Sequence, residues 1–220
     1  MSEPSFASVV LDVDSTLSGI EGIDWLARGR DEVVAREIAE LTDRAMRGEL
    51  PLEQIYGARL AAIRPNLSDI RALSAAYIAA AAPGAHDAVR AMRAAGVRLV
   101  LVSGGLREAI LPLARELGFN DSDVQAVSIR FDIDGHYAGF DDASPLTTSA
   151  GKAKAIGDLG LSRPVLMVGD GVTDLAARSA VQQFAAFTGF VSRDSVVAQA
   201  DEVVGSFQAL QNLVLGFSHS

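Results

Sequence analysis

Strand-length apolar runs alternate with helix-like patterns along most of this chain, and this alternation restricts its fold more than any other feature. The apolar runs are residues 8–12, 97–102 and 164–168, with weaker candidates at 184–187 and 202–204. Their apolar residues are mostly continuous, as is typical of parallel strands covered on both faces. Helical patterns lie between the runs at 86–95, 107–117, 152–159 and 173–179. We therefore expect an α/β fold, a doubly wound parallel sheet with right-handed crossovers.

The stretch between Leu17 and Ala82 interrupts this alternation, because its apolar residues recur only at helical spacing. It is too long for a simple crossover connection, and Pro83-Gly84 marks the return to the alternating pattern. A chain of 220 residues can hold one large domain with an insertion of this size. We expect residues 17–82 to form a helical cap on an α/β core made of residues 1–16 and 83–220.

The first apolar run ends in two acidic residues, Asp12 and Asp14, which are followed by Ser15 and Thr16. Two carboxylates this close repel each other unless a cation lies between them. A single aspartate would suit a simple helix cap, but a pair directly after a buried strand suits that role poorly. We therefore expect a divalent-metal site at the carboxyl end of this strand.

Polar or glycine-rich segments also follow the next two main runs. Ser103-Gly104-Gly105 follows the second run, and Asp170-Gly171-Val172-Thr173-Asp174 follows the third. Gly151-Lys152-Ala153-Lys154 opens the helix before the third run. Ligands bind beyond the carboxyl ends of the strands in an open parallel α/β sheet. Carboxylates for a metal, donors for phosphate oxygens and a lysine for phosphate charge are the groups that phosphoryl transfer needs. Each segment alone is a common turn or surface feature, whereas their joint occurrence predicts a phosphoryl-transfer site.

Residues 126–140 form a second interruption. Val127, Ile129 and Phe131 alternate with polar residues, and Asp134-Gly135 then leads into a second short run. Asp-Gly between alternating runs is a strong hairpin signal, so we expect a β-hairpin flap here. Asp132 and Asp134 repeat the spacing of the first acidic pair, but no continuous apolar strand precedes them, and we interpret them as turn residues.

Composition restricts the chemistry and the partners. The chain has no cysteine and only three histidines, so carboxylates must carry any metal chemistry, which favours Mg²⁺ over zinc or iron. The net charge of −9 makes nucleic acid and anionic membranes poor partners. The first residues lack the basic and apolar regions of a signal peptide, and no run is long enough to span a bilayer, so we expect a cytoplasmic location.

The acidic and glycine-rich motifs resemble those of a known enzyme superfamily. Asp12-Val13-Asp14-Ser15-Thr16, Ser103-Gly104-Gly105, Lys152 and Gly169-Asp170-Gly171-Val172-Thr173-Asp174 resemble the signature motifs of the haloacid dehalogenase superfamily of phosphatases. Glu21-Gly22-Ile23-Asp24, Arg44-Ala45-Met46-Arg47-Gly48, Arg59-Leu60-Ala61-Ala62-Ile63 and the hairpin resemble the phosphoserine phosphatase family within it. The resemblance implies a Rossmann-like core and Mg²⁺-dependent hydrolysis of a small phosphomonoester, O-phospho-L-serine, in serine biosynthesis.

The resemblance also implies a different role for each aspartate of the motifs. Asp12 would be the nucleophile that forms an aspartyl-phosphate, and Asp14 would protonate the leaving oxygen and later activate water. Mg²⁺ would be held by the Asp12 carboxylate, the Asp14 backbone carbonyl and the Asp170 carboxylate. Asp174 would support these ligands from behind.

Other residues would bind the substrate. The residues that the resemblance assigns to the phosphoryl group and its orientation are Ser103, Gly104, Lys152 and Thr173. In the cap, Glu21 would bind the ammonium group, Arg59 would grip the carboxylate and Met46 would pack over the ligand. From the residues alone, a solvated helix face for Glu21 and Arg59 and a core position for Met46 would be the simpler interpretation.

Other functions remain open. A related phosphatase or a phosphotransferase with an acceptor such as homoserine would use the same motifs. A phospho-acceptor signalling domain also places acidic residues, a hydroxyl and a lysine around Mg²⁺, but the long helical insertion and Ser15-Thr16 argue against that class. A catalytically silent binding module is disfavoured because the whole catalytic set is present.

Overall fold

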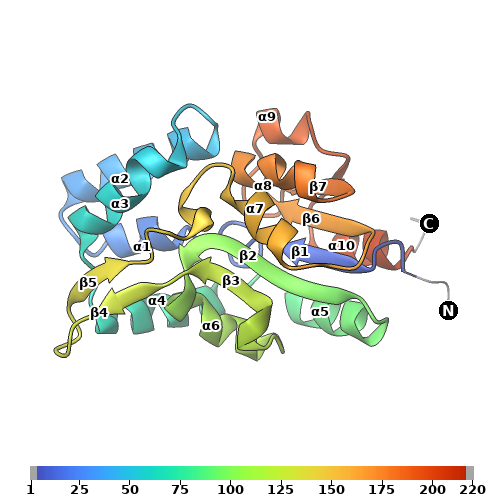
Figure 1. Ribbon diagram of the computed structural model, residues 1–220, viewed down its shortest axis with the longest axis horizontal. Coiled ribbons are helices and arrows are strands. Elements are labelled where there is room, and N and C mark those ends of the chain that lie inside the picture. The colour runs from blue at the N-terminus through green and yellow to red at the C-terminus, as the bar shows by residue number, and fades with distance from the viewer. Residues whose placement is uncertain (1–3, 217–220) are drawn as a thin grey trace.

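The computed structural model describes residues 4–216 and is built around one six-stranded sheet (Figure 1). Residues 1–3, which entered the expectation about location, lie outside this range. All neighbouring strands are parallel, in the order β3-β2-β1-β6-β7-β8. The strands are β1 (Ser8–Leu11), β2 (Arg98–Leu106), β3 (Val124–Val127), β6 (Val165–Gly169), β7 (Gln183–Phe187) and β8 (Glu202–Val204). The predicted parallel sheet is confirmed.

The register of the central strands brings the polar segments together. All four residues of β1 are buried, as expected of a strand between two neighbours and under helices on both faces. Leu11 pairs with Leu101 of β2 on one side and with Val168 of β6 on the other. The residues that follow β1 and β6, together with the end of β2, therefore share one edge of the sheet.

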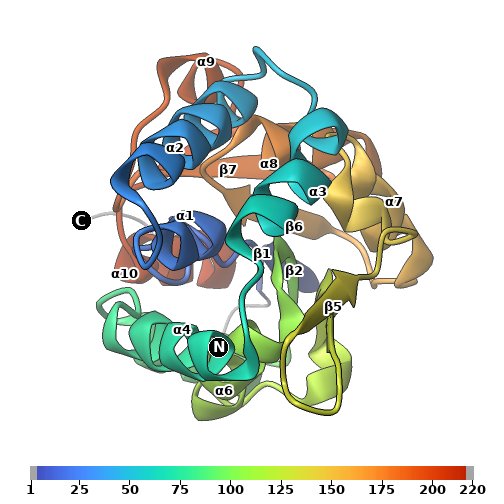
Figure 2. The ribbon, with the colours of Figure 1, turned by 90° about the vertical axis from the view of Figure 1, so that its left-hand side faces the viewer.

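Helices cover both faces of the sheet (Figures 1 and 2). The helices of one face are α5 (Ala85–Ala94), α6 (Arg107–Glu116) and α10 (Phe207–Leu215), and those of the other are α7 (Gly151–Asp158) and α8 (Val172–Ala176). The short helix α9 (Asp194–Val197) joins β7 to β8. Among residues 4–216, none of the helices combines the length and the apolar character that crossing a bilayer requires.

Four helices fill the stretch between β1 and α5. They are α1 (Gly22–Ala27), α2 (Glu32–Met46), α3 (Leu52–Ile63) and α4 (Leu67–Ala79). Figure 1 shows α1, α2 and α3 beyond the carboxyl ends of the central strands, whereas α4 packs against α6 of the core layer. Local capping sets these helices: the Asp31 side chain caps α2, and an Asn66–Asp69 capping box starts α4.

The two connections to this helical segment lie side by side. The Ala82 amide donates to the Leu17 carbonyl at 2.9 Å, and the Gly19 amide donates to the Ala80 carbonyl at 2.9 Å. Such paired connections are what an insertion with closely spaced ends requires. The division into a core and a cap of residues 17–82 stays a prediction, and the packing of α4 on α6 ties the last of these helices to the core.

The expected hairpin is present, with one correction. β4 (Ile129–Phe131) pairs with β5 (Tyr137–Phe140), and Asp132 accepts hydrogen bonds from the amides of Asp134 and His136, as expected of a turn residue. The expectation that Val127 belongs to the hairpin is wrong, because Val127 ends β3 and pairs with Leu106 of β2. Full burial of Val127 in the main sheet outweighs its place in the alternating pattern.

Candidate active site

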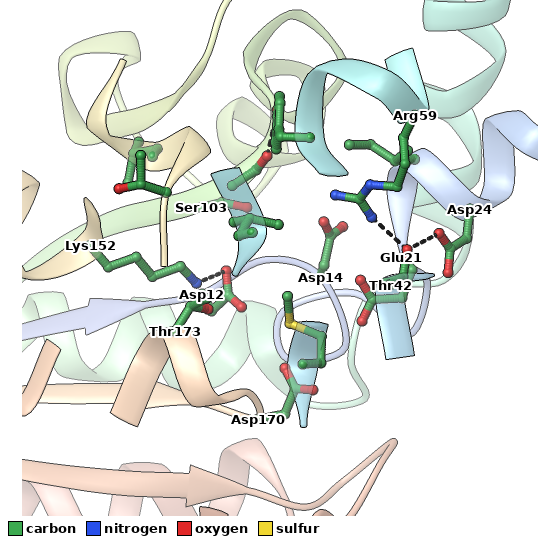
Figure 3. Close-up of a pocket in the computed structure, with 17 residues that line it drawn as sticks. Asp12, Asp14, Glu21, Asp24, Thr42, Arg59, Ser103, Lys152, Asp170 and Thr173 are labelled. Atoms are coloured by element: carbon green, nitrogen blue, oxygen red, sulfur yellow. Dashed lines mark hydrogen bonds and ion pairs between the residues drawn. The ribbon is translucent and has the colours of Figure 1, made fainter. Parts of the chain in front are cut away.

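The residues singled out in the sequence line one pocket between the sheet edge and helices α1, α2 and α3 (Figure 3). Those that line it are Asp12, Asp14, Glu21, Met46, Arg59, Ser103, Gly104, Lys152, Asp170 and Thr173. Asp174 lies behind the lining, in contact with Lys152. The exposed pair Asp132 and Asp134 belongs to the hairpin and takes no part in the pocket.

Lys152 joins the ends of β1 and β6. Its ammonium lies 2.7 Å from Asp12 Oδ1 and 2.5 Å from Asp174 Oδ1, and all three side chains are buried. Burial opposes the charge of Lys152, but the Asp12 and Asp174 carboxylates outweigh it and raise the pKa of the lysine. Burial and the nearby Asp12 charge raise the pKa of Asp174 to about 7, against the effect of Lys152. Lys154, by contrast, is exposed and pairs with Asp158.

Asp14 has the surroundings of a carboxyl group that holds a proton. Its Oδ1 accepts hydrogen bonds from the Tyr77 hydroxyl at 2.6 Å and from the Gly22 amide at 3.2 Å. Burial, followed by the charges of Glu21 and Asp12, raises the pKa of Asp14 well above its ordinary value, although the Tyr77 hydrogen bond opposes this shift. A raised pKa suits a group that donates a proton near neutral pH.

Arg193 is a functional candidate that the sequence did not reveal. It forms an ion pair with Asp170 Oδ2 and lies 3.9 Å from Glu21 Oε1. Asp170 Oδ1 also accepts a hydrogen bond of 3.3 Å from Thr16, and Glu21 Oε1 accepts one of 2.7 Å from Ser15. The only signal in the sequence was the place of Arg193 after the end of the weak strand candidate 184–187.

The cap side of the pocket contains a chain of polar contacts that starts at Arg59 (Figure 3). Arg59 Nη1 donates to Thr42 Oγ1 at 2.5 Å, and Thr42 Oγ1 donates to Asp24 Oδ1 at 2.5 Å. Arg59 is buried, and its Nε has no hydrogen-bond partner among residues 4–216. On the same side, the Tyr56 hydroxyl of α3 donates to the Gly104 carbonyl of β2 at 2.8 Å, which links the cap side of the pocket to the sheet edge. Sequence reasoning missed the parts played by Thr42 and Tyr56.

The charge of the pocket fits a cation. Five carboxylates line it, against two cationic side chains: Asp12, Asp14, Glu21, Asp24 and Asp170, with Arg59 and Lys152. Carboxylate oxygens of Asp12, Asp170 and Asp174 lie within 4.8 Å of one another, and all three residues are buried. Both Asp174 oxygens already accept hydrogen bonds from Lys152 and from the Gly171 amide. Both Asp170 oxygens are engaged as well, by Thr16 and Arg193, but Asp12 and Asp170 line the pocket whereas Asp174 lies behind it. Asp12 and Asp170 are therefore the carboxylates that could hold a divalent metal, with Asp174 in a supporting position.

Fold and site together define a hydrolase of the haloacid dehalogenase type. Residues 6–181 match the family of haloacid dehalogenase-like hydrolases, and the chain belongs to this family. Its relatives include chloroplastic phosphoserine phosphatase of Arabidopsis thaliana, 36% identical over 213 residues, which cover 94% of this chain and 72% of that protein. Phosphoserine phosphatase of Rattus norvegicus is 35% identical over 206 residues, which cover 92% of this chain and 91% of the rat enzyme.

A solved structure supports the fold independently. The phosphoserine phosphohydrolase-like protein from Francisella tularensis superposes with a TM-score of 0.84 at 24% identity, covering 94% of this chain and 99% of that one. Membership of a hydrolase family favours an enzyme over a phospho-acceptor signalling domain or a silent binding module.

Proposed function

We propose that this hydrolase is an Mg²⁺-dependent phosphoserine phosphatase, which converts O-phospho-L-serine and water to L-serine and phosphate. One observation carries the proposal: Arg59 and Glu21 face the Asp12–Lys152 pair across a single pocket. The carboxylate, ammonium and phosphate groups of phosphoserine would then each meet a group of opposite charge, with a metal beside Asp12. The names of the relatives point to the same substrate.

In the first half of the proposed reaction, an Asp12 carboxylate oxygen forms a bond to phosphorus. The bond between phosphorus and the serine oxygen breaks, and its electron pair stays on that oxygen, which takes the proton from Asp14. Ser103, the Gly104 amide and Lys152 bind the phosphoryl oxygens and stabilise their developing charge, while Thr173 orients the site.

In the second half, water attacks the phosphorus of the aspartyl-phosphate. The water gives one proton to Asp14, the bond to Asp12 breaks, and the Asp12 carboxylate is restored with the release of phosphate. Asp14 ends the cycle protonated, as it began. The raised pKa that burial gives Asp14 supports this double role.

We assign the metal site to the Asp12 carboxylate, the Asp14 backbone carbonyl and the Asp170 carboxylate, with Asp174 behind them. When bound, Mg²⁺ neutralises charge, so that an anionic nucleophile and an anionic phosphate can approach each other. The excess of carboxylates in the pocket supports this assignment, since the oxygen donors match the preference of Mg²⁺.

Removal of divalent metal is expected to abolish phosphate release, and added Mg²⁺ is expected to restore it. Phosphate release is measured before chelation, in excess EDTA and after repletion. As a readout independent of activity, Mg²⁺ should raise the melting temperature of the wild type but not that of Asp170→Asn. Undiminished activity in excess EDTA would rule out the metal assignment.

Substrate preference is expected to follow the charges of the cap. Phosphoethanolamine lacks the substrate carboxylate and 3-phosphohydroxypropionate lacks the ammonium group. Each should have kcat/KM roughly 10- to 100-fold below that of O-phospho-L-serine, because a charged hydrogen bond contributes about 1.5–3 kcal/mol. Arg59→Met should remove the advantage of phosphoserine over phosphoethanolamine. Steady-state kinetics on the panel checks both statements.

Arg36→Met, an exposed change on α2, serves as the matched control and should keep the wild-type preference. Equal kcat/KM for phosphoserine and unrelated phosphomonoesters would defeat the proposed substrate. The appearance of phosphohomoserine when homoserine is added would instead identify a phosphotransferase.

We further propose that the enzyme acts in the cytoplasm and supplies free L-serine in serine biosynthesis. Fractionation of cells that express the full chain tests the compartment.

A further inference from the structure

Tyr77 is a buried tyrosine whose hydroxyl group reaches the candidate acid. It lies on α4, outside the pocket lining, and its side chain is fully buried. Its hydroxyl donates to Asp14 Oδ1 at 2.6 Å, the shorter of the two hydrogen bonds to that oxygen. Burial, together with the Asp14 charge, raises the pKa of Tyr77 well above its ordinary value, so the phenol keeps the proton that it donates.

The chain makes room for this contact at Gly22. A Cβ atom at position 22 would overlap the Tyr77 hydroxyl, so a side chain there would displace the tyrosine. The Gly22 amide itself donates to the same Asp14 oxygen at 3.2 Å. The start of α1 and the last turns of α4 therefore meet at Asp14 Oδ1.

The other oxygen of Asp14, Oδ2, lies toward the glycine-rich segment 103–105. A Cβ atom at Gly105 would be 3.2 Å from Asp14 Oδ2. With Oδ1 held by two donors from the cap segment, Oδ2 is left as the atom that can exchange a proton with the leaving group. An acid with a free χ2 rotation would present either oxygen, whereas this one is fixed.

We propose that Tyr77 is a positioning residue for Asp14: its hydroxyl fixes Oδ1 so that Oδ2 faces the leaving oxygen of the substrate. The inference rests on the proposed aspartyl-phosphate chemistry. Its effect should be confined to steps in which Asp14 transfers a proton, and in phosphoenzyme formation this means only donors whose leaving group needs a proton.

The test compares two phosphoryl donors on Tyr77→Phe, which removes the hydroxyl and keeps the ring. Serine leaves as a poor leaving group that needs a proton, whereas acetate leaves from acetyl phosphate without one. Rapid-quench measurement of phosphoenzyme formation should show about a 10-fold slower rate from O-phospho-L-serine in the variant, because misplacing a catalytic group costs rate. The rate from acetyl phosphate should stay close to that of the wild type, and KM for phosphoserine should change little.

Ser74→Ala is the matched control, because it removes another buried hydroxyl of α4, which among residues 4–216 bonds only to the Ile70 carbonyl. It should leave both rates unchanged. Gly22→Ala should reproduce the selective slowing, since the new methyl group displaces the Tyr77 hydroxyl. Equal slowing with both donors, or no slowing with phosphoserine, would overturn the inference.

The outcome is separable from the proposed substrate. A wild-type enzyme that forms no phosphoenzyme from phosphoserine contradicts the proposed function. In that case the same comparison is made with the phosphomonoester that the wild type hydrolyses fastest, and the prediction for Tyr77 is unchanged.

Discussion

Replacement of Asp12 by asparagine is expected to lower kcat for phosphoserine by roughly 10⁴-fold or more, as the loss of a nucleophile does in other enzymes. An amide at this position cannot form the acyl phosphate, and it also removes a charge from the metal site. Asparagine has nearly the same shape as aspartate, so the fold should persist. Circular dichroism and phosphate-release kinetics check the two expectations.

The hairpin supplies a matched control for this change. Asp132→Asn alters the first aspartate of a pair with the same spacing, and Asp132 is exposed and bonds only within its turn among the described residues. Its kcat should stay at the wild-type value. Appreciable activity in Asp12→Asn would contradict the assigned nucleophile.

Replacement of Lys152 by methionine is expected to affect both activity and stability. The variant loses the ammonium between Asp12 and Asp174, so kcat/KM should fall by about 10³-fold through lost stabilisation of the phosphoryl charge. Removing one partner of a buried ion pair leaves charge uncompensated, so the free energy of unfolding should fall by about 3 kcal/mol. Kinetics and urea unfolding measure these two effects.

The stability loss should depend on pH with a definite sign. The pKa of Asp174 is already raised to about 7 by burial and by the Asp12 charge. A carboxyl group whose pKa is higher in the folded state favours folding while protonated, and this contribution is lost as the pH rises through that folded pKa. Lys152→Met removes the cation that offsets this, so the destabilisation should be larger at about pH 8 than at about pH 5.

Lys154→Met is the control for both effects, because Lys154 is exposed and pairs only with Asp158 among the described residues. It should leave kcat/KM and unfolding close to the wild type. A variant at position 152 that keeps wild-type kcat/KM would contradict the role given to that lysine.

The core of the fold could be predicted because strands buried on both faces appear in the sequence as continuous apolar runs. Continuous apolar runs gave β1, β2 and β6, and their register then brought Asp12 and Asp170 to one edge. β3 was not predicted, because Val127 and Ile129 belong to one alternating pattern in the sequence although they lie in different sheets. Only tertiary burial against Leu106 separates them.

The candidate site was predictable for residues that directly follow a strand in the sequence. It was not predictable for residues that reach the site from distant elements. Tyr77 stands in a helical pattern of apolar residues, so nothing local indicates that its hydroxyl meets Asp14. Position 22 needs a glycine because the Tyr77 hydroxyl of α4 occupies the space of a side chain there, and nothing in the neighbouring sequence indicates this. Arg193 lies beyond a weak strand and reaches Asp170 only through the fold.

The central claim is that phosphoserine transfers its phosphoryl group to Asp12. Rapid mixing with O-phospho-L-serine, acid quench, borohydride reduction and peptide mass spectrometry test it most directly, because borohydride converts an aspartyl-phosphate to homoserine. We predict homoserine at position 12, formed as serine is released. Homoserine at position 14 or elsewhere, or release of serine with no modified residue, would contradict the account.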